Sequence, residues 1–194
     1  MEEVSNGRSP SGRATAAEPV VSALRDGIPS VGHMGVTGSS MPLTAAQKRA
    51  ATGVLVDLRA GGAVWQHNGD CINADAHAGH AWKAMGGKLH LHPPTHDAKR
   101  AFQFAHASDS PRPYLDRNSD IVEASDVLVA MPKEFNEELR SGTWATVRRA
   151  RKRKLPIIFV WPDGSTSIEW PAQAMDARSA ETTGSARKGD SAVA

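Results

Sequence analysis

The chain has 194 residues, enough for one domain with tails, and its formal net charge of +2 is too small to indicate nucleic-acid binding by itself. Its single cysteine, Cys71, excludes an internal disulfide and fits a reducing compartment. No apolar run approaches the roughly 20 residues that a membrane-spanning helix needs, and the N-terminus has no signal-peptide pattern. These features predict a cytoplasmic protein without a membrane partner.

The first part of the chain predicts a leader, a strand and a helix. Residues 1–31 are rich in Gly, Ser, Ala and Pro and show little periodicity, which predicts a flexible N-terminal leader. Residues 33–37 predict the first strand, and a loop follows it. Thr44 is placed to cap a helix that runs to Gly61, because apolar residues recur after it at helical spacing.

The middle of the chain predicts two further strands and one more helix. A second strand (63–66) precedes a helix from Asp75 to Met85, and a third strand (88–92) ends at a pair of prolines. The segment 95–113 is polar and irregular, which indicates a loop bordering a site.

Two short apolar runs rich in β-branched residues predict the last strands. Val127–Ala130 and Ile157–Trp161 are nearly continuous apolar runs, as expected for strands buried on both faces of a parallel sheet. Between them, the pair Gly142 and Thr143 opens a helix. Residues 165–194 are rich in Ser, Thr, Ala and Gly, and they predict a mostly disordered C-terminal tail.

Strands and helices alternate along residues 32–164, which predicts one α/β domain of the Rossmann-like, doubly wound class. Its mostly parallel five-stranded sheet would have helices on both faces. Ligands in such sheets bind beyond the carboxyl ends of the strands. The candidate ligand-binding residues at these ends are Gly38, Ser39 and Ser40 after the first strand, Asn68, Gly69 and Asp70 after the second, and Pro132 after the fourth.

The helix that begins at Gly142 is a candidate for binding a phosphate. Ser141, Gly142 and Thr143 would offer backbone N–H groups and hydroxyls at a helix N-terminus, where the dipole favours an anion. Arg117 and Asn118 precede the fourth strand, and Arg117 could add a bidentate contact to the same phosphate.

Structural roles stay open for several of these residues. The Gly-Thr turn could do no more than cap its helix, and Arg117 could pair with Asp116 or Asp120. Asp75 could interact with the dipole of the helix that it begins, or it could bind a ligand hydroxyl such as a ribose diol. Asn68 is a second candidate for contacting the ribose.

The histidines and the basic run receive other interpretations. No pairing of histidines has an established metal-ligand spacing, so neither a metal nor another cofactor is expected. His67 and His92, at strand ends, are interpreted as pocket-lining groups. The basic residues from Arg148 to Lys154 predict a solvated helix face, and a nucleic-acid patch is the alternative, weakened because no aromatic residues interleave with them.

A set of short segments carries a family likeness: Val36-Thr-Gly-Ser, His67-Asn-Gly-Asp, Ala74-Asp75, Arg117-Asn118, Asp126-Val-Leu-Val-Ala and Gly142-Thr143. In order and spacing, over about residues 33–163, they resemble the SLOG superfamily. This Rossmann-like group includes the lonely-guy phosphoribohydrolases and the DNA-processing protein A family, and the chain is similar to its small stand-alone members. The resemblance implies a nucleotide-type ligand and a homodimer.

The chain departs from the lonely-guy hydrolases at the position of their catalytic glutamate, which Thr146 occupies. A hydroxyl cannot act as a general base near pH 7 as a carboxylate does. The resemblance therefore implies a non-catalytic domain that binds a nucleotide or a nucleotide-derived molecule, such as an ADP-ribose-type signal. One alternative is an N-glycosidase or phosphoribohydrolase in which Asp70, Asp75 or Asp163 replaces the glutamate. A DNA-associated protein that uses the basic helix is the other.

Overall fold

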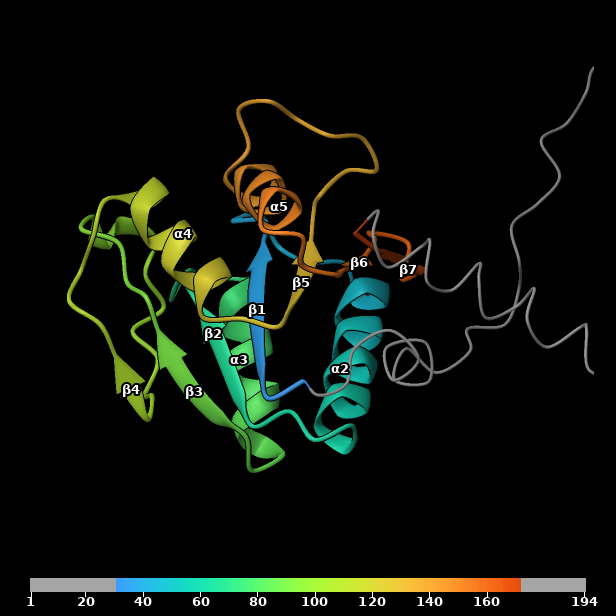
Figure 1. Cartoon of the computed structure of the whole chain (residues 1–194), viewed down its shortest axis with the longest axis horizontal. Coiled ribbons are helices and arrows are strands. Elements are labelled where there is room, and N and C mark those ends of the chain that lie inside the picture. The colour runs from blue at the N-terminus through green and yellow to red at the C-terminus, as the bar shows by residue number, and fades with distance from the viewer. Residues whose placement is uncertain (1–30, 172–194) are drawn as a thin grey trace, which may run out of the picture.

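The computed structural model describes residues 31–171, which form a mostly parallel sheet with helices on both faces (Figure 1). The strand order is β4-β3-β2-β1-β5-β6-β7, and only β7 runs antiparallel to its neighbour. The strands are β1 (His33–Gly38), β2 (Trp65–Asn68), β3 (Lys88–Leu91), β4 (Ala107–Ser108), β5 (Val127–Met131), β6 (Ile157–Val160) and β7 (Thr166–Glu169). This is the doubly wound α/β fold that the sequence predicted.

The sheet has seven strands, whereas the sequence predicted five. The two additional strands lie at the edges: β4 falls in the predicted irregular loop, and β7 pairs with β6 beyond residue 164, where the tail was predicted to begin. An edge strand pairs on one side only and needs no continuous apolar pattern, so periodicity did not reveal either one. The predicted leader before residue 31 and the predicted tail after residue 171 lie outside the described residues.

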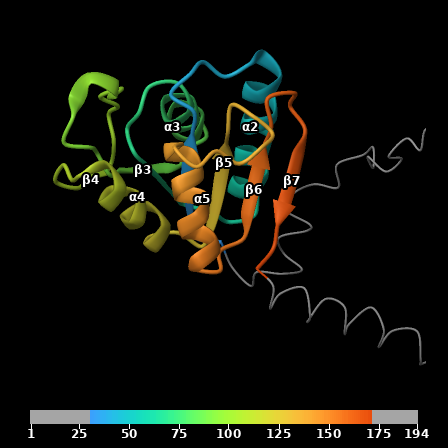
Figure 2. The ribbon, with the colours of Figure 1, turned by 90° about the horizontal axis from the view of Figure 1, so that it is seen from above.

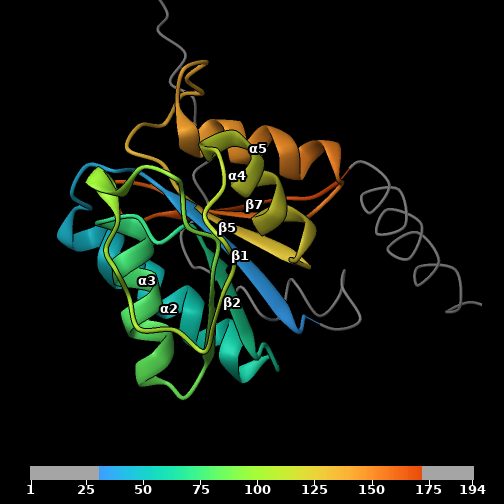
Figure 3. The same cartoon turned by 90° about the vertical axis from the view of Figure 1, so that its left-hand side faces the viewer.

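Four helices of the described residues flank the sheet. They are α2 (Ala45–Ala60), α3 (Ala74–Ala84), α4 (Tyr114–Glu123) and α5 (Gly142–Lys152), and the 3-10 turn η1 (Asp97–Lys99) follows β3. Figures 2 and 3 show α2 and α3 on one face and α4 and α5 on the other. The Thr44 hydroxyl accepts a hydrogen bond from Gln47 N at 3.0 Å, which confirms the predicted cap of α2. No helix in this part of the chain is long and apolar enough to cross a membrane.

Each face of the sheet has its own hydrophobic core. On one face, residues of β1, β5 and β6 pack with α2 and α3. On the other face, the buried apolar side chains are Val122, Leu128, Ala130, Trp144, Val147, Ala150, Ile157 and Phe159. This second core therefore belongs to β5, β6, α4 and α5, and β2 and β3 add no side chain to it. The residues of β2 and β3 that alternate onto the same face are Trp65, His67, Lys88 and His90.

Candidate functional site

A pocket of about 400 Å³ lies beyond the carboxyl end of β1, between the following loop and the N-terminus of α5. It is lined by Gly38, Ser39, Ser40, Met41, Lys99, Tyr114, Lys133, Glu138, Arg140, Ser141, Gly142 and Thr143. The two segments meet because β1 and β5 are neighbours in the sheet, and Ser39 N donates to Met131 O at 3.0 Å. The structure thus brings the predicted candidates of the first loop next to those of the α5 N-terminus.

The N-terminus of α5 combines free backbone donors with a closely packed aromatic ring. The Ser141 hydroxyl accepts from Trp144 N at 3.4 Å, so other first-turn N–H groups stay available to an anion. Tyr114 packs directly on Gly142, where a Cβ would lie 2.9 Å from the ring and from the phenolic oxygen. Any side chain at position 142 therefore displaces Tyr114 from the pocket wall.

Three cationic side chains line the pocket and were not among the predicted site residues. Lys99 comes from η1, and Lys133 and Arg140 come from the loop between β5 and α5. The carboxylate that lines the pocket is Glu138, and it lies 3.2 Å from Lys133 Nζ. The lining thus has three cations and one carboxylate, and Lys133 also pairs with Glu134, at 3.0 Å, outside the lining. The only sequence signal was the position of these cations in loops that follow predicted strands.

Asp70 lies behind the pocket wall, where it anchors the loop that carries Lys99. Its carboxylate is fully buried, and it accepts hydrogen bonds from Arg100 Nε and from Gln103 N, both at 3.0 Å. Asp70 is therefore connected to the pocket through Lys99 rather than by lining it.

Asp75 and Asn68 also lie in the buried layer beneath the pocket. Asp75 Oδ2 accepts from Gly69 N and from Cys71 N, both at 3.1 Å. Burial raises the pKa of Asp75 to about 6, although the charge of Arg117 and the two N–H donors oppose this shift. Asn68 donates to Asp75 O at 3.2 Å, and its side-chain oxygen accepts from a backbone N–H. Both side chains hold the turn between β2 and α3.

Arg117 is buried beneath Tyr114. The centre of its guanidinium lies 4.4 Å from the Tyr114 ring centroid, and Nη2 donates to Cys71 Sγ at 3.1 Å. The group lies directly over Gly69, because a Cβ there would come within 1.4 Å of Nη1. Tyr114 thus separates Arg117 from the N-terminus of α5. Burial raises the pKa of Cys71 to about 11, so its thiol stays protonated near neutral pH.

The remaining candidates, Asn118 and Pro132, do not line the pocket. Asp120 pairs with Arg112 at 2.6 Å, not with Arg117. Asn118 is buried, and its amide nitrogen has no hydrogen-bond partner. The carbonyl of Pro132 accepts from Gln47 Nε2 at 2.9 Å.

The residues considered for N-glycosidic cleavage place no carboxylate in the pocket lining. Thr146 is buried, and its hydroxyl donates to Gly142 O at 3.1 Å, within α5. Asp163 accepts from the Ser165 hydroxyl at 2.6 Å. Together with the buried Asp70 and Asp75, it lies outside the pocket lining.

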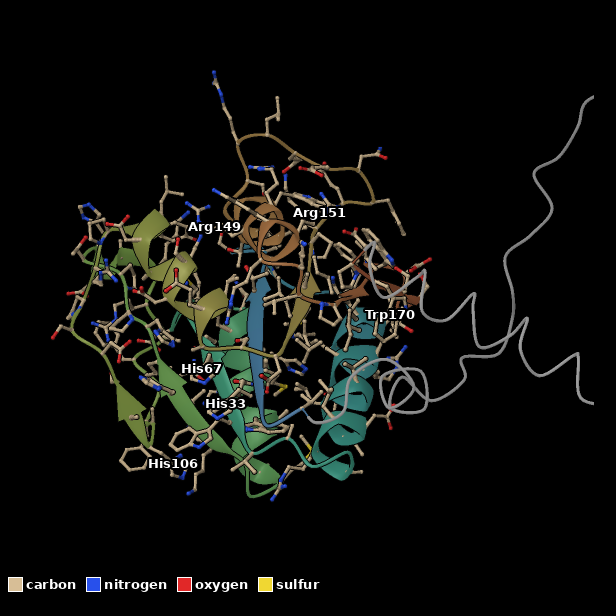
Figure 4. All side chains as sticks on the ribbon, viewed as in Figure 1. His33, His67, His106, Arg149, Arg151 and Trp170 are labelled. Atoms are coloured by element: carbon tan, nitrogen blue, oxygen red, sulfur yellow. The ribbon has the colours of Figure 1, made fainter. Side chains whose placement is uncertain are left out.

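The basic run on α5 is largely occupied by contacts within the chain. Arg148 and Arg151 both bind Glu137, at 3.0 and 2.6 Å, and Arg151 also binds Glu169 at 2.7 Å. Arg149, which Figure 4 labels beside Arg151, donates to the Ser119 hydroxyl at 3.0 Å. Because these arginines are paired within the chain, they agree better with the predicted helix face than with a continuous surface that binds nucleic acid.

His67 and His92, interpreted from the sequence as pocket-lining groups, do not line this pocket. His67 Nε2 lies 3.0 Å from His33 Nδ1, and His67 Nδ1 lies 3.0 Å from His92 Nε2. Burial lowers the pKa of His67 to about 3, and the neighbouring imidazoles lower it as well. The spacing of the histidines along the chain did not indicate this cluster, because His33, His67 and His92 come from β1, from β2 and from the loop after β3.

Comparison with known proteins supports the fold. No protein-family model and no curated protein matches this sequence. Among solved structures, the chain is similar to the molybdenum cofactor binding protein of Rippkaea orientalis, with 18% identity over 78% of this chain and 84% of that chain and a TM-score of 0.54. It is similar to the molybdenum cofactor carrier protein of Chlamydomonas reinhardtii, with 19% identity, coverage of 78% and 85%, and a TM-score of 0.50.

A third similar structure is DNA processing protein A of Streptococcus pneumoniae. The two chains are 18% identical, and the alignment covers 66% of this chain but only 49% of that one, with a TM-score of 0.52. Likeness at these identities shows a shared fold. The chain therefore shares a Rossmann-like fold with these proteins, as its sequence pattern predicted.

Proposed function

We propose that this chain binds a nucleotide or a nucleotide-derived molecule, such as an ADP-ribose-type signal, in the pocket between the β1 loop and α5, and that it does not cleave the ligand. The observation that carries the proposal is the position of three cations, Lys99, Lys133 and Arg140, around the N-terminus of α5. A helix N-terminus and cations converging on one pocket favour a phosphate over a neutral ligand.

The non-catalytic part of the proposal rests on the absence of a suitably placed carboxylate among the described residues. Thr146 replaces the glutamate of the lonely-guy hydrolases and is bonded to its own helix. Glu138 does line the pocket, but its carboxylate is held in an ion pair with Lys133, 3.2 Å from Nζ. A carboxylate engaged in such a pair is less available to act as a general base on a ligand.

The similar structures support a small-molecule ligand in general terms. Two of them are named for binding or carrying the molybdenum cofactor, so the fold accommodates a ligand of that size in those proteins. In this chain, the loop cations and the α5 N-terminus would make the first contacts with a phosphate. Arg117 would contribute only after Tyr114 moves, because the Tyr114 ring lies over its guanidinium.

Calorimetric titration with ADP-ribose, ADP, AMP and adenosine tests the proposal. The three phosphate-bearing ligands should bind, and adenosine should not bind measurably. Gly142→Asp should abolish binding, since it displaces Tyr114 and adds a negative charge at the helix N-terminus. Lys133→Met should weaken binding about tenfold, in line with the loss of a charge-assisted contact.

Arg49→Met is the matched control for the lysine substitution, because Arg49 is exposed on α2 and lies outside the pocket lining. Equal affinity for adenosine and AMP would show that the phosphate does not contact the N-terminus of α5. This result would contradict the proposed location of the ligand. Chromatography of the same mixtures tests the second half of the proposal. Release of free adenine that is lost in Arg117→Ala would establish an N-glycosidase instead.

The SLOG resemblance also implies a homodimer, and we include it in the proposal. Sedimentation equilibrium of the purified chain measures it directly. A mass of 20.6 kDa at micromolar concentration would identify a monomer and reject this part.

A further inference from the structure

Three histidines converge on the α4–α5 face of the sheet, away from the ligand pocket. His67 belongs to β2, and His90 and His92 lie on and just after β3. The parallel register places His67 opposite His90, so both side chains point to the same face. Figure 4 shows His67 beside His33 of the neighbouring strand β1. None of these residues lines the proposed nucleotide pocket.

The ring nitrogens of the three histidines are close enough to share one ion. One nitrogen from each of His67, His90 and His92 lies within 4.8 Å of the others. His67 Nδ1 and His92 Nε2 are only 3.0 Å apart. Two nitrogens that bind the same tetrahedral ion at roughly 2.0–2.1 Å lie about 3.3 Å from each other. A small rotation of either ring would therefore admit an ion between them.

Each of these rings has its other nitrogen next to an outer partner. His67 Nε2 lies 3.0 Å from His33 Nδ1. Asp109 contacts the other two rings. Its Oδ1 lies 2.7 Å from His90 Nε2, and its Oδ2 lies 2.8 Å from His92 Nδ1. Metal-binding histidines in proteins commonly donate their second N–H to a carboxylate or another acceptor, which fixes the ring and its tautomer.

The cluster also contains a buried nitrogen whose bonding is incomplete. His92 is 4% exposed, and its Nδ1, although close to Asp109, has no partner with hydrogen-bond geometry. Buried polar atoms are normally paired, because leaving one unpaired costs free energy. A rotation that aligns His92 Nδ1 with Asp109 would turn Nε2 relative to His67, which is the movement that an ion requires.

We propose that His67, His90 and His92 bind one divalent transition-metal ion of the zinc class, with Asp109 and His33 orienting the ligands. His67 would bind through Nδ1 and His92 through Nε2, because their opposite nitrogens contact the outer partners. His90 uses Nε2 for Asp109 and has Nδ1 to offer. In this arrangement each ring carries a proton on the nitrogen that faces its outer partner and offers the other nitrogen to the ion.

The ligand set defines the class of ion and leaves one coordination position open. Three imidazoles suit zinc, cobalt, nickel or copper, whereas magnesium and calcium prefer oxygen ligands. Zinc sites with three protein ligands keep a fourth position for water or another small ligand. The ion can reach the site from solvent, because the His90 and Asp109 side chains are 25% and 42% exposed.

Zinc titration of the chelator-treated full chain, monitored by calorimetry, tests the proposal. We expect one ion per chain and an increase in the melting temperature with zinc. Cobalt(II) should give the visible absorption of a four-coordinate site. His90→Gln should lower zinc affinity at least tenfold, and Asp109→Asn should lower it by about 10–100-fold through the lost orientation of two rings.

Two exposed histidines outside the cluster provide the matched control. The double variant His80→Gln/His96→Gln should bind zinc like the wild type, because neither residue belongs to the cluster. The metal-free melting temperature of His90→Gln should stay close to that of the wild type, which separates loss of a ligand from loss of the fold. Absence of saturable zinc binding, or equal affinity in wild type and His90→Gln, would overturn the proposal.

Discussion

The two halves of the α4–α5 sheet face are built from opposite chemistry. Over β5 and β6, aliphatic and aromatic side chains such as Leu128, Ile157 and Phe159 pack against α5. Over β2 and β3, the same face carries Trp65, His67 and His90, and α4 and α5 make their main contacts elsewhere, with β1, β5, β6 and each other. In Figure 1, α5 lies above the upper ends of β1 and β5, whereas β3 and β4 lie below α4 and farther from α5.

The difference separates a region that stabilises the fold from a region whose side chains are costly to bury. Apolar burial contributes about 25 cal/mol for each Å² removed from water, and the α5 half gains this directly. Buried imidazoles in the other half contribute little apolar area and need polar partners. Four histidines and one aspartate, on or just after adjoining strands, contact one another instead, and His92 Nδ1 is left without a partner of hydrogen-bond geometry. We infer that the first half holds the fold and that the second is available for a ligand.

The largest expected effect is in the apolar half. Leu128→Ala should lower the free energy of unfolding by about 2–5 kcal/mol, because it leaves a cavity at a fully buried position of β5. Urea denaturation should show a lower midpoint with an unchanged slope. His90→Gln, measured without metal, should cost less than about 1 kcal/mol at its half-buried position. Similar losses in the two variants would break the contrast between the halves.

The carboxyl of Asp75, buried on the opposite side of β2, tests how burial changes the pH dependence of stability. The pKa of Asp75 is raised to about 6 in the folded chain from an ordinary value of 3.8. The folded state therefore binds the proton more tightly, and stability falls as pH rises from about 4 to about 6. Compared with Asp75→Asn, the wild type should lose about 1–3 kcal/mol over this interval. Parallel pH profiles of the two proteins would contradict this assignment.

The boundary between the two halves lies at Gly35 of β1, over which Ile121 of α4 packs. A Cβ at this position would lie 2.7 Å from Ser125 Oγ and 3.1 Å from Leu128 Cδ1. Gly35→Ala should therefore destabilise the chain by about 1–3 kcal/mol through overpacking. Gly53→Ala is the control, because a Cβ at this position of α2 meets nothing within 4 Å. If Gly35→Ala had the same melting temperature as the wild type, α4 would be free to shift and accommodate the methyl group.

The smallest expected effect concerns the ion pair that ties the loop after β4 to α4. Arg112 contacts Asp120 at 2.6 Å, and the arginine side chain is half exposed. Exposed pairs contribute about 0.2–1 kcal/mol, and salt weakens them. Arg112→Met should lower the unfolding free energy by no more than this at low salt, and the loss should shrink at 1 M salt. A loss above about 2 kcal/mol would place this pair among the supports of the fold.

Local sequence patterns were sufficient for the fold class and for half of the candidate site. The apolar runs at Val127–Ala130 and Ile157–Trp161 predicted central strands, and β5 and β6 occupy them. Thr44 and Ser141 are positioned as caps because a cap depends only on residues three places away. The first loop was a candidate because ligands bind beyond the carboxyl ends of parallel strands, and the α5 N-terminus because it favours an anion.

Other parts of the site could not be predicted in this way. Asp70, Asp75 and Arg117 were candidates because of their positions at strand ends and in motifs, yet each lies in the layer behind the pocket wall. Whether a strand-end side chain points into a pocket or under it depends on the turn that follows. For Asp70, a left-handed backbone conformation (φ of 56°) directs the carboxylate to the 97–103 loop.

The sequence by itself determined the order of the central strands and the helices, the helix caps and the helix N-terminus that faces the pocket. These features depend on short-range periodicity and on residues a few places apart. Only the tertiary structure decided that Lys99, Lys133 and Arg140 share one pocket and that three histidines from two strands and a following loop share one face. The physical reason is strand register. The pairing of His67 with His90 is set by the long-range alignment of β2 and β3, and no spacing along the chain encodes it.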